Sequence, residues 1–259
     1  MNRSPSESSS SGRLRVERRH LGDGTRIELI LDRPHKRNAL SRPLLRAATA
    51  AVHEASAQPD LRALVLRGTG PVFCAGADIS DMRQLKTPDE ATAFIREVHG
   101  LCQALRDVPV PTIALIQGAA LGGGLEAAAA CDLRIGTVDS RYGMPEVRVG
   151  LPSVIEAALL PRLIGWGRAA DLVLCGHTIA AGEALNWGLL NAVVETGALD
   201  DALRAKLAEL QRCDPLAVRK QKELMRVWER GDLAASIDHS IAVFGSVFDN
   251  GPPRALALR

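Results

Sequence analysis

Three consecutive glycines, Gly122 to Gly124, constrain the fold of this chain more than any other feature of its sequence. They follow a short aliphatic run, Val110 to Ile116, which predicts a strand, and they enter an alanine-rich segment that predicts a helix ending near Ala130. Successive glycines cost backbone entropy and give a helix no packing contact, so another group is expected to approach the main chain closely there. A tight crossing of two helices is the alternative explanation.

Short apolar runs alternate with segments of helical periodicity through the first two-thirds of the chain. Further strands are predicted at 27–31, 63–66, 133–136 and 190–194, and further helices at 41–57 and 89–105. This alternation favours an α/β fold with parallel strand pairing. After Pro152 the pattern is almost entirely helical, and we interpret that part as a layer that packs on a neighbouring subunit. The helices expected there span 153–163, 168–174, 180–185, 200–213, 215–230 and 233–248.

The 259 residues suffice for one large domain, or for a domain with a small appendage, with a sizeable core. A net charge of +2 gives no strong field for binding nucleic acid or a membrane surface. The five cysteines show no Cys-x-x-Cys spacing and the six histidines no i, i+4 pair, so we expect no disulfides, no metal and a reducing cytoplasm. The serine-rich residues 1–12 are expected to form a disordered tail, without the apolar run typical of a signal or anchor.

Two carboxylates are expected within reach of the glycines. Glu126 is one turn into the alanine-rich helix, so we expect its side chain to be enclosed and its pKa raised, which makes it a proton donor at neutral pH. A surface position near the helix N-terminus is the alternative. Glu146 follows Pro145 in a predicted loop. The turn from Pro71 to Ile79 either admits a ligand to its main chain or is an ordinary strand-to-helix connection. Backbone N–H groups at a helix start, with an acid and a base nearby, indicate chemistry at a developing oxyanion.

Several ordered blocks resemble those of the crotonase, or enoyl-CoA hydratase/isomerase, superfamily between about Leu14 and Phe248. The blocks are Arg33-Pro34 with Asn38-Ala39-Leu40, Phe73 to Ile79, Gly118 to Glu126, Cys131 to Arg134, and Pro145-Glu146 with Gly150-Leu151-Pro152. The resemblance implies a spiral of repeated ββα units over residues 13–195 and a C-terminal helical region over 196–259 that forms a trimerisation layer. It also implies a homotrimer or a dimer of trimers.

The same resemblance implies hydration of a 2-enoyl-CoA thioester to a 3-hydroxyacyl-CoA. The main-chain N–H groups of Ala77 and Gly123 would form an oxyanion hole for the thioester oxygen. Glu126 and Glu146 would handle the water, and their individual roles stay open because their protonation is coupled. No metal or redox cofactor is implied, since coenzyme A is part of the substrate.

The resemblance also implies a coenzyme A site. It would use the main chain near Lys36, Arg37 and Asn38, and residues around Ala75, Ala77, Asp78 and Ile79. The side chains of Arg33, Lys36 and Arg37 would meet phosphates or else form a solvated basic loop.

Two segments depart from the superfamily pattern. Ile155 and Glu156 stand where typical hydratases carry a glycine pair near the water and acyl site. Glu156 is then either a third acidic group in the pocket or a residue that faces solvent or a neighbouring helix. The second alternative is favoured, because an unpaired buried carboxylate is costly. The segment Phe248 to Pro253 also differs, so the wall of the acyl pocket is expected to differ too.

Other functions stay open within and beyond the superfamily. An enoyl-CoA isomerase, a thioester hydrolase or a decarboxylase would share the fold and the oxyanion hole. RNA binding is disfavoured because the helix over 41–57 carries only Arg42 and Arg46 as cations. A scaffold without activity is disfavoured because nothing structural requires Glu126, Glu146 and Gly123 together.

Overall fold

The computed structural model describes residues 8–10, 14–249 and 253, and the chain divides into two compact units, Met1–Leu207 and Ala208–Arg259. The division lies inside helix α8 (Leu199–Gln211), later than the boundary expected after residue 195. The reason is that Leu199, Leu203 and Leu207 are buried, which ties the first turns of α8 to the larger unit. An ion pair of 2.7 Å between Arg67 Nη1 and Asp200 Oδ1 adds to this attachment.

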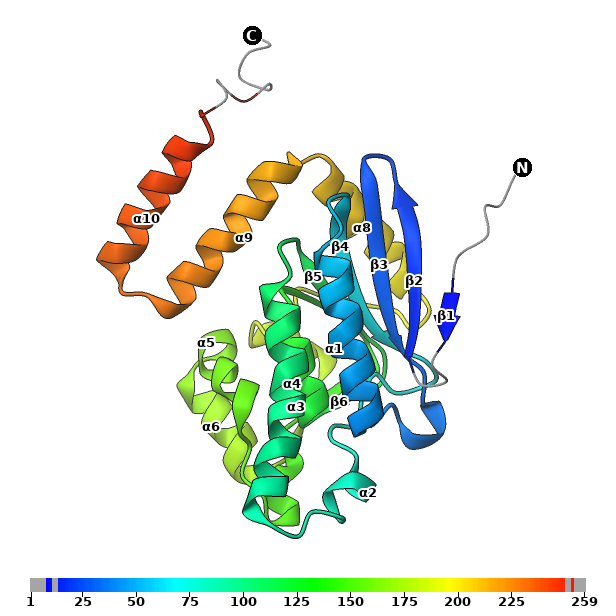
Figure 1. The fold of residues 1–259 in the computed structure, drawn as a ribbon. Coiled ribbons are helices and arrows are strands. Elements are labelled where there is room, and N and C mark those ends of the chain that lie inside the picture. Colours follow the sequence, from blue (N-terminus) through cyan, green and yellow to red (C-terminus); the bar gives the residue numbers. More distant parts are fainter. Residues whose placement is uncertain (1–7, 11–13, 250–252, 254–259) are drawn as a thin grey trace, which may run out of the picture. The chain divides into compact units, whose positions relative to one another are not determined.

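A seven-stranded sheet forms the centre of the larger unit (Figure 1). Its strands, in spatial order, are β1 (Ser8–Ser10), β2 (Leu14–Leu21), β3 (Gly24–Leu31), β4 (Leu61–Gly68), β5 (Thr112–Ile116), β7 (Leu133–Thr137) and β10 (Ala192–Val194). The β1–β2 and β2–β3 pairs are antiparallel, and every later pair is parallel, as predicted for an α/β fold.

Strand β1 corrects part of the expectation for the N-terminal tail. Ser8–Ser10 pair with residues 15–17 of β2, because the outer edge of β2 offers unpaired backbone groups to an extended segment. The other residues of the predicted disordered segment 1–12 lie outside the described residues.

A second, three-stranded sheet contains β6 (Ala119–Leu121), β8 (Arg141–Gly143) and β9 (Thr178–Ala180). Chain order alternates between the two sheets: β5 is followed by β6 and then by helix α4 (Gly123–Ala129), and β7 is followed by β8. The β6–β8 pair is parallel, so consecutive turns of the chain stack in register. This is the spiral of ββα units that the resemblance implies.

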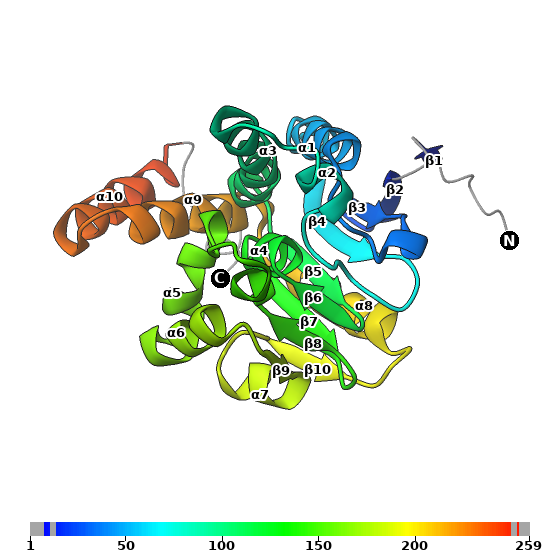
Figure 2. The ribbon, with the colours of Figure 1, turned by 90° about the horizontal axis from the view of Figure 1, so that it is seen from below.

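Helices α1 (Arg42–Ser56) and α3 (Pro88–Asp107) pack together on one face of the large sheet, and α8 lies on the other side (Figure 2). Thr87 caps α3 by accepting a hydrogen bond from the N–H of Glu90. Ser41, the expected cap of α1, makes no such bond; the N–H of Arg42 donates instead to Asp81 Oδ2, 2.8 Å away. Asp81 belongs to the short helix α2 (Ile79–Met82).

The segment after β8 is broken into short turns. It contains two 3₁₀ helices, η2 (Pro145–Val149) and η3 (Ile155–Leu159), followed by α5 (Leu160–Ile164), α6 (Trp166–Cys175) and α7 (Ala181–Asn186). The single helix predicted over 153–163 is therefore split between η3 and α5. Pro161, near the start of α5, has no N–H to donate to the carbonyl oxygen of Ala157, so one continuous α-helix cannot run through this point.

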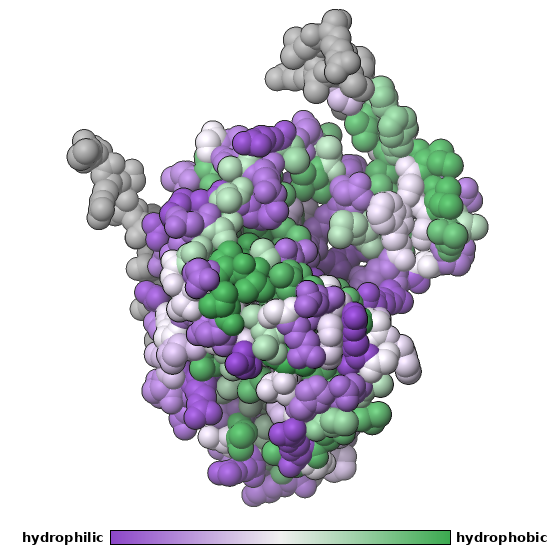
Figure 3. All heavy atoms as spheres, turned by 180° about the vertical axis from the view of Figure 1, so that it is seen from behind, coloured by the Kyte–Doolittle hydropathy of each residue, from purple (hydrophilic) through white to green (hydrophobic). Residues whose placement is uncertain are grey.

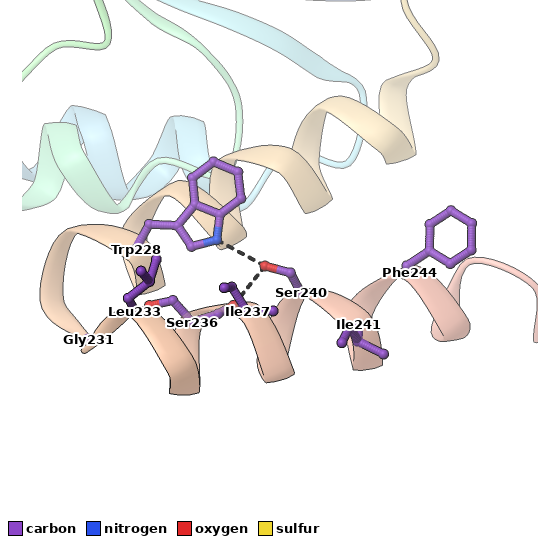
Figure 4. A pocket seen from close by; sticks show the side chains of 8 residues that line it. All are labelled: Trp228, Gly231, Leu233, Ser236, Ile237, Ser240, Ile241 and Phe244. Atoms are coloured by element: carbon purple, nitrogen blue, oxygen red, sulfur yellow. Dashed lines mark hydrogen bonds between the residues drawn. The ribbon is translucent and has the colours of Figure 1, made fainter.

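The smaller unit contains the antiparallel pair α9 (Pro215–Arg230) and α10 (Leu233–Ser246). Trp228 Nε1 donates to Ser240 Oγ at 2.9 Å and joins the two helices across a pocket of about 540 Å³ (Figure 4). Hydrophobic side chains gather over α10 (Figure 3), where Ile241 and Phe244 are about two-thirds exposed. Within the described residues, no helix combines the length and the hydropathy needed to cross a bilayer.

Candidate active site

The glycine triplet lies where β6 turns into α4, and two of its glycines are required by close neighbours. A Cβ atom on Gly122, which has a φ of 51°, would collide with Glu146 Oε1. A Cβ atom on Gly124 would lie 2.8 Å from Cys74 Cβ and still closer to the Cys74 carbonyl oxygen. The close approach predicted from the sequence is thus made by a neighbouring main chain and a carboxylate, and a crossing of two helices does not account for it.

The amides of Ala77 and Gly123 are adjacent. Leu40 forms a parallel bridge with Ala77: its N–H donates to Gly76 O, and its carbonyl oxygen accepts from the N–H of Asp78. The N–H of Ala77, which lies between these two bonded groups along the chain, therefore points away from Leu40. A Cβ atom on Gly123 would lie 3.5 Å from Ala77 N, and Gly123 N is the first amide of α4. Across the described part of the chain, neither N–H has a main-chain acceptor. The pair can therefore receive an oxygen that carries partial negative charge.

Glu126 is buried, with 4% of its surface exposed, so the alternative of a surface glutamate does not hold. Burial raises its pKa to about 8, and the nearby charges of Glu146 and Glu156 act in the same direction. A hydrogen bond of 3.1 Å from the N–H of Ala157 to Glu126 Oε1 opposes this rise. The carboxyl group consequently carries a proton at neutral pH, as the sequence predicts.

Glu146 lies at the start of η2 and is partly buried. Its Oε2 accepts a hydrogen bond of 2.9 Å from Ser153 Oγ, and its Oε1 lies against the main chain of Gly122. Because Gly122 directly precedes α4, this contact places the Glu146 carboxylate beside the helix that carries Glu126. The part of Ser153 was missed in the sequence, since a serine seven residues after a glutamate gives no periodic signal.

Glu156 faces a neighbouring helix, as the cost of an isolated buried charge suggests. His99 Nδ1, on α3, lies 3.0 Å from Glu156 Oε1 and 3.3 Å from Oε2, and Arg106 Nη1 lies 3.8 Å from Oε1. The preceding residue, Ile155, is β-branched and has a left-handed φ of 43°, a strain of about 1–3 kcal/mol. Sequence reasoning missed His99 and Arg106, because their contact with Glu156 exists only in the folded chain.

Two of the predicted coenzyme A residues use their side chains to hold the fold. Asn38 is fully buried, and its side chain accepts a hydrogen bond from Arg33 N and donates to Thr69 O and Val72 O. Asp78 caps α2 by accepting from the N–H of Ser80 and pairs with Arg33 at 2.9 Å. Burial alone would raise the pKa of Asp78, but the hydrogen bonds from Ser80 and Arg33 outweigh it and lower the pKa.

Neither alternative left open for Arg33, a contact with phosphate or a place in a solvated basic loop, matches its surroundings. Arg33 is buried, and its guanidinium is occupied by Asp78 and by the carbonyl oxygen of Ala39 at 2.6 Å. Lys36 and Arg37, in and after the 3₁₀ turn η1 (Pro34–Lys36), are exposed, as is Ile79 at 56%. Ala75 is partly buried, and its N–H donates to Arg37 O. The exposed members of the predicted set thus lie in η1, directly after it and at the start of α2, and main-chain hydrogen bonds join these two parts of the chain.

Within the described residues, one group of side chains could hold a metal ion: Asp171, Cys175 and His177, whose ligand atoms lie within 4.8 Å of one another. The sequence did not predict it, because three different ligand types at spacings of four and two residues form neither a histidine pair nor a Cys-x-x-Cys motif. It lies at the end of α6 and includes none of the residues predicted for catalysis. All five cysteines are free.

Comparisons with known proteins find relatives over most of the chain. The profile of the enoyl-CoA hydratase/isomerase family matches residues 24–252. An enoyl-CoA isomerase/hydratase of Mycosarcoma maydis is 33% identical over 86% of this chain and 84% of its own length, and the mitochondrial methylglutaconyl-CoA hydratase of Mus musculus is 33% identical over 84% and 71%. The crystal structure of an enoyl-CoA hydratase from Bacillus anthracis superposes with a TM-score of 0.84 at 28% identity and covers 90% of each chain.

Proposed function

The chain belongs to the enoyl-CoA hydratase/isomerase family of the crotonase superfamily, and from this premise we propose that it adds water to a 2-enoyl-CoA thioester to give a 3-hydroxyacyl-CoA. The observation that carries the proposal is the pair of carboxyl groups beside two adjacent main-chain amides. Glu126 is buried with a pKa of about 8, and Glu146 is held against the glycine that opens the same helix. An isomerase needs no second carboxylate to activate water, so the retained pair favours hydration.

In the proposed reaction the thioester oxygen accepts hydrogen bonds from the N–H groups of Ala77 and Gly123. These amides stabilise the enolate-like charge that forms when a nucleophile adds to the β-carbon. The carboxylate of Glu146 takes one proton from water while the water oxygen bonds to the β-carbon. The protonated carboxyl of Glu126 gives its proton to the α-carbon. After this step Glu146 is protonated and Glu126 is ionised. Proton exchange with solvent then restores the starting state.

We further propose that coenzyme A lies along the loops that carry Lys36, Arg37, Ala75 and Ile79, where exposed main chain and cationic side chains meet. The reaction as proposed needs no metal or redox cofactor.

The exposed apolar side chains of α10 support assembly into a homotrimer or a dimer of trimers. The five free thiols support a reducing cytoplasm as the location.

The proposal is tested with crotonyl-CoA and longer 2-enoyl-CoA thioesters, by the loss of the conjugated absorbance and by the mass of the product. The wild-type product should gain the mass of one water. Glu126→Gln and Glu146→Gln should each reduce kcat by about 100-fold or more, because each removes a proton-transfer group. Glu54→Gln, an exposed change on α1, is the matched control and should leave turnover unchanged.

Two outcomes would contradict the proposal. Turnover that survives either glutamine substitution would remove the glutamate pair from the reaction. A product of unchanged mass with a migrated double bond would identify an isomerase instead.

A further inference from the structure

Glu156 is a buried ionisable group that the proposed reaction does not use. Only 2% of its side chain is exposed, and a carboxylate so placed is stable only with partners. Its partners come from one face of α3, where His99 and Arg106 are separated by two helical turns. The His99 side chain is 46% exposed, so the His99–Glu156 ion pair joins a group in contact with solvent to a buried carboxylate.

The backbone connects this carboxylate to the proposed proton donor. Ala157, the next residue, donates its N–H to Glu126 Oε1 at 3.1 Å. On the other side of Glu156, Ile155 holds a left-handed conformation that persists only where surrounding contacts fix it. Glu156 lies between Ile155 and Ala157 in the chain, and its ion pairs with α3 supply contacts of this kind.

We infer that Glu156 is a positioning residue for Glu126: its buried carboxylate, held by His99 and Arg106, fixes the turn at the start of η3 and with it the N–H that Ala157 donates to Glu126. The inference rests on the proposed hydratase function, in which Glu126 delivers a proton to the α-carbon. It assigns a role to a side chain that stands where typical hydratases carry glycine.

Charged and titratable groups surround the carboxyl groups of Glu126 and Glu156. The titratable and charged side chains that face them are His99, Cys102 and Arg106 from α3, and Glu146 from η2. A negative charge at Glu156 disfavours a second negative charge at Glu126, in addition to the larger effect of burial. The hydrogen bond from the N–H of Ala157 lowers the Glu126 pKa, and its effect is larger than that of the Glu156 charge.

The test is the pH dependence of kcat/KM for crotonyl-CoA in the full-length wild-type protein and in Glu156→Gln. When the turn comes loose, Glu126 loses the N–H of Ala157, which lowers the Glu126 pKa more strongly than the Glu156 charge raises it, so the alkaline limb should move to higher pH. Relative to its own value at pH 6, kcat/KM at pH 9 should be higher in Glu156→Gln than in the wild type. A purely structural role would lower activity equally at both pH values. Glu97→Gln, which removes a paired carboxylate elsewhere on α3, is the matched control and should not move the limb.

A direct titration keeps the inference testable if Glu156→Gln fails to fold. In wild-type protein labelled with ¹³C at the glutamate carboxyls, the Glu126 signal is identified by its loss in Glu126→Gln. The same titration in His99→Gln, which replaces one partner of Glu156, should move the Glu126 signal from its wild-type pKa; an unmoved signal there would overturn the inference, as would an unmoved limb in a folded Glu156→Gln. Full activity in Glu126→Gln would instead contradict the proposed function, and the titration would still report on the contact with Glu156.

Discussion

Burial of the Glu126 carboxyl makes the stability of the folded chain depend on pH. The folded pKa of about 8 lies above the value of an exposed glutamate, so between about pH 4.5 and 8 the folded state holds a proton that the unfolded state has lost. Stability from this group is therefore complete below the unfolded pKa and declines as pH rises through the folded pKa. Glutamine in its place stays neutral throughout.

We expect Glu126→Gln to be more stable than the wild type at pH 9, by at most about 4 kcal/mol, and nearly equal to it at pH 5. Urea unfolding at both pH values and at one fixed protein concentration measures this difference. An equal stability gap at the two pH values would show that the carboxyl does not titrate in this range.

Single residues were predictable from the sequence where a local pattern required them. Glu126, one turn into an alanine-rich helix, was predicted to be enclosed rather than at the surface, and the glycines were predicted to admit a neighbour rather than a crossing helix; both predictions are confirmed. The hydrogen bonds of Arg33 with Asn38 and Asp78 were not predictable, because the sequence does not distinguish a polar residue that is buried from one that is exposed. The same holds for the contact between His99 and Glu156, which are 57 positions apart.

At the level of elements, the start of α4 depends on how closely β6 and the Cys74 segment approach it. Gly124→Ala would place a methyl group against the Cys74 main chain, which cannot move without breaking its hydrogen bonds to Ala119 and Leu121. We expect a loss of about 2–3 kcal/mol. Gly100→Ala on α3, where no atom lies within 4 Å of the new Cβ, should instead gain about 0.5–1 kcal/mol.

Urea unfolding of the two alanine variants beside the wild type tests this contrast. The prediction is wrong if Gly124→Ala unfolds at the wild-type denaturant concentration. A loss of stability in Gly100→Ala would show instead that helix α3 is packed there by a partner.

The long helices and the aliphatic strands were predictable, and α9 (Pro215–Arg230) was predicted with its observed ends. The strands β6, β8 and β9 were missed because three residues are too few to show a period of two. Strand β2 was missed for another reason: its sequence carries four charged residues among eight, and one edge of it faces only β1. Parallel pairing could be inferred from the alternation of strands and helices, but the second sheet could not.

For the whole molecule, the exposed apolar face of α10 predicts that the chain self-associates. Ile241 and Phe244 are 66% and 69% exposed, a costly arrangement for two large side chains in water. In the proposed homotrimer we expect a double substitution, Ile241→Ser with Phe244→Ser, to yield monomers, whereas Asp238→Asn on the same helix should not. Light scattering on a sizing column gives the mass of each species. A monomeric wild type would contradict the proposed assembly.

The unequal burial of the five thiols has a practical consequence. Cys74 and Cys102 are fully enclosed, and burial raises the pKa of Cys74 to about 12 and that of Cys102 well above its ordinary value. Cys131 is buried as well, whereas Cys175 and Cys213 are exposed, one in each compact unit. Maleimide dyes should therefore attach to these two positions in the unmodified chain. Energy transfer between the dyes would then measure whether the distance between these two positions changes when a thioester is added.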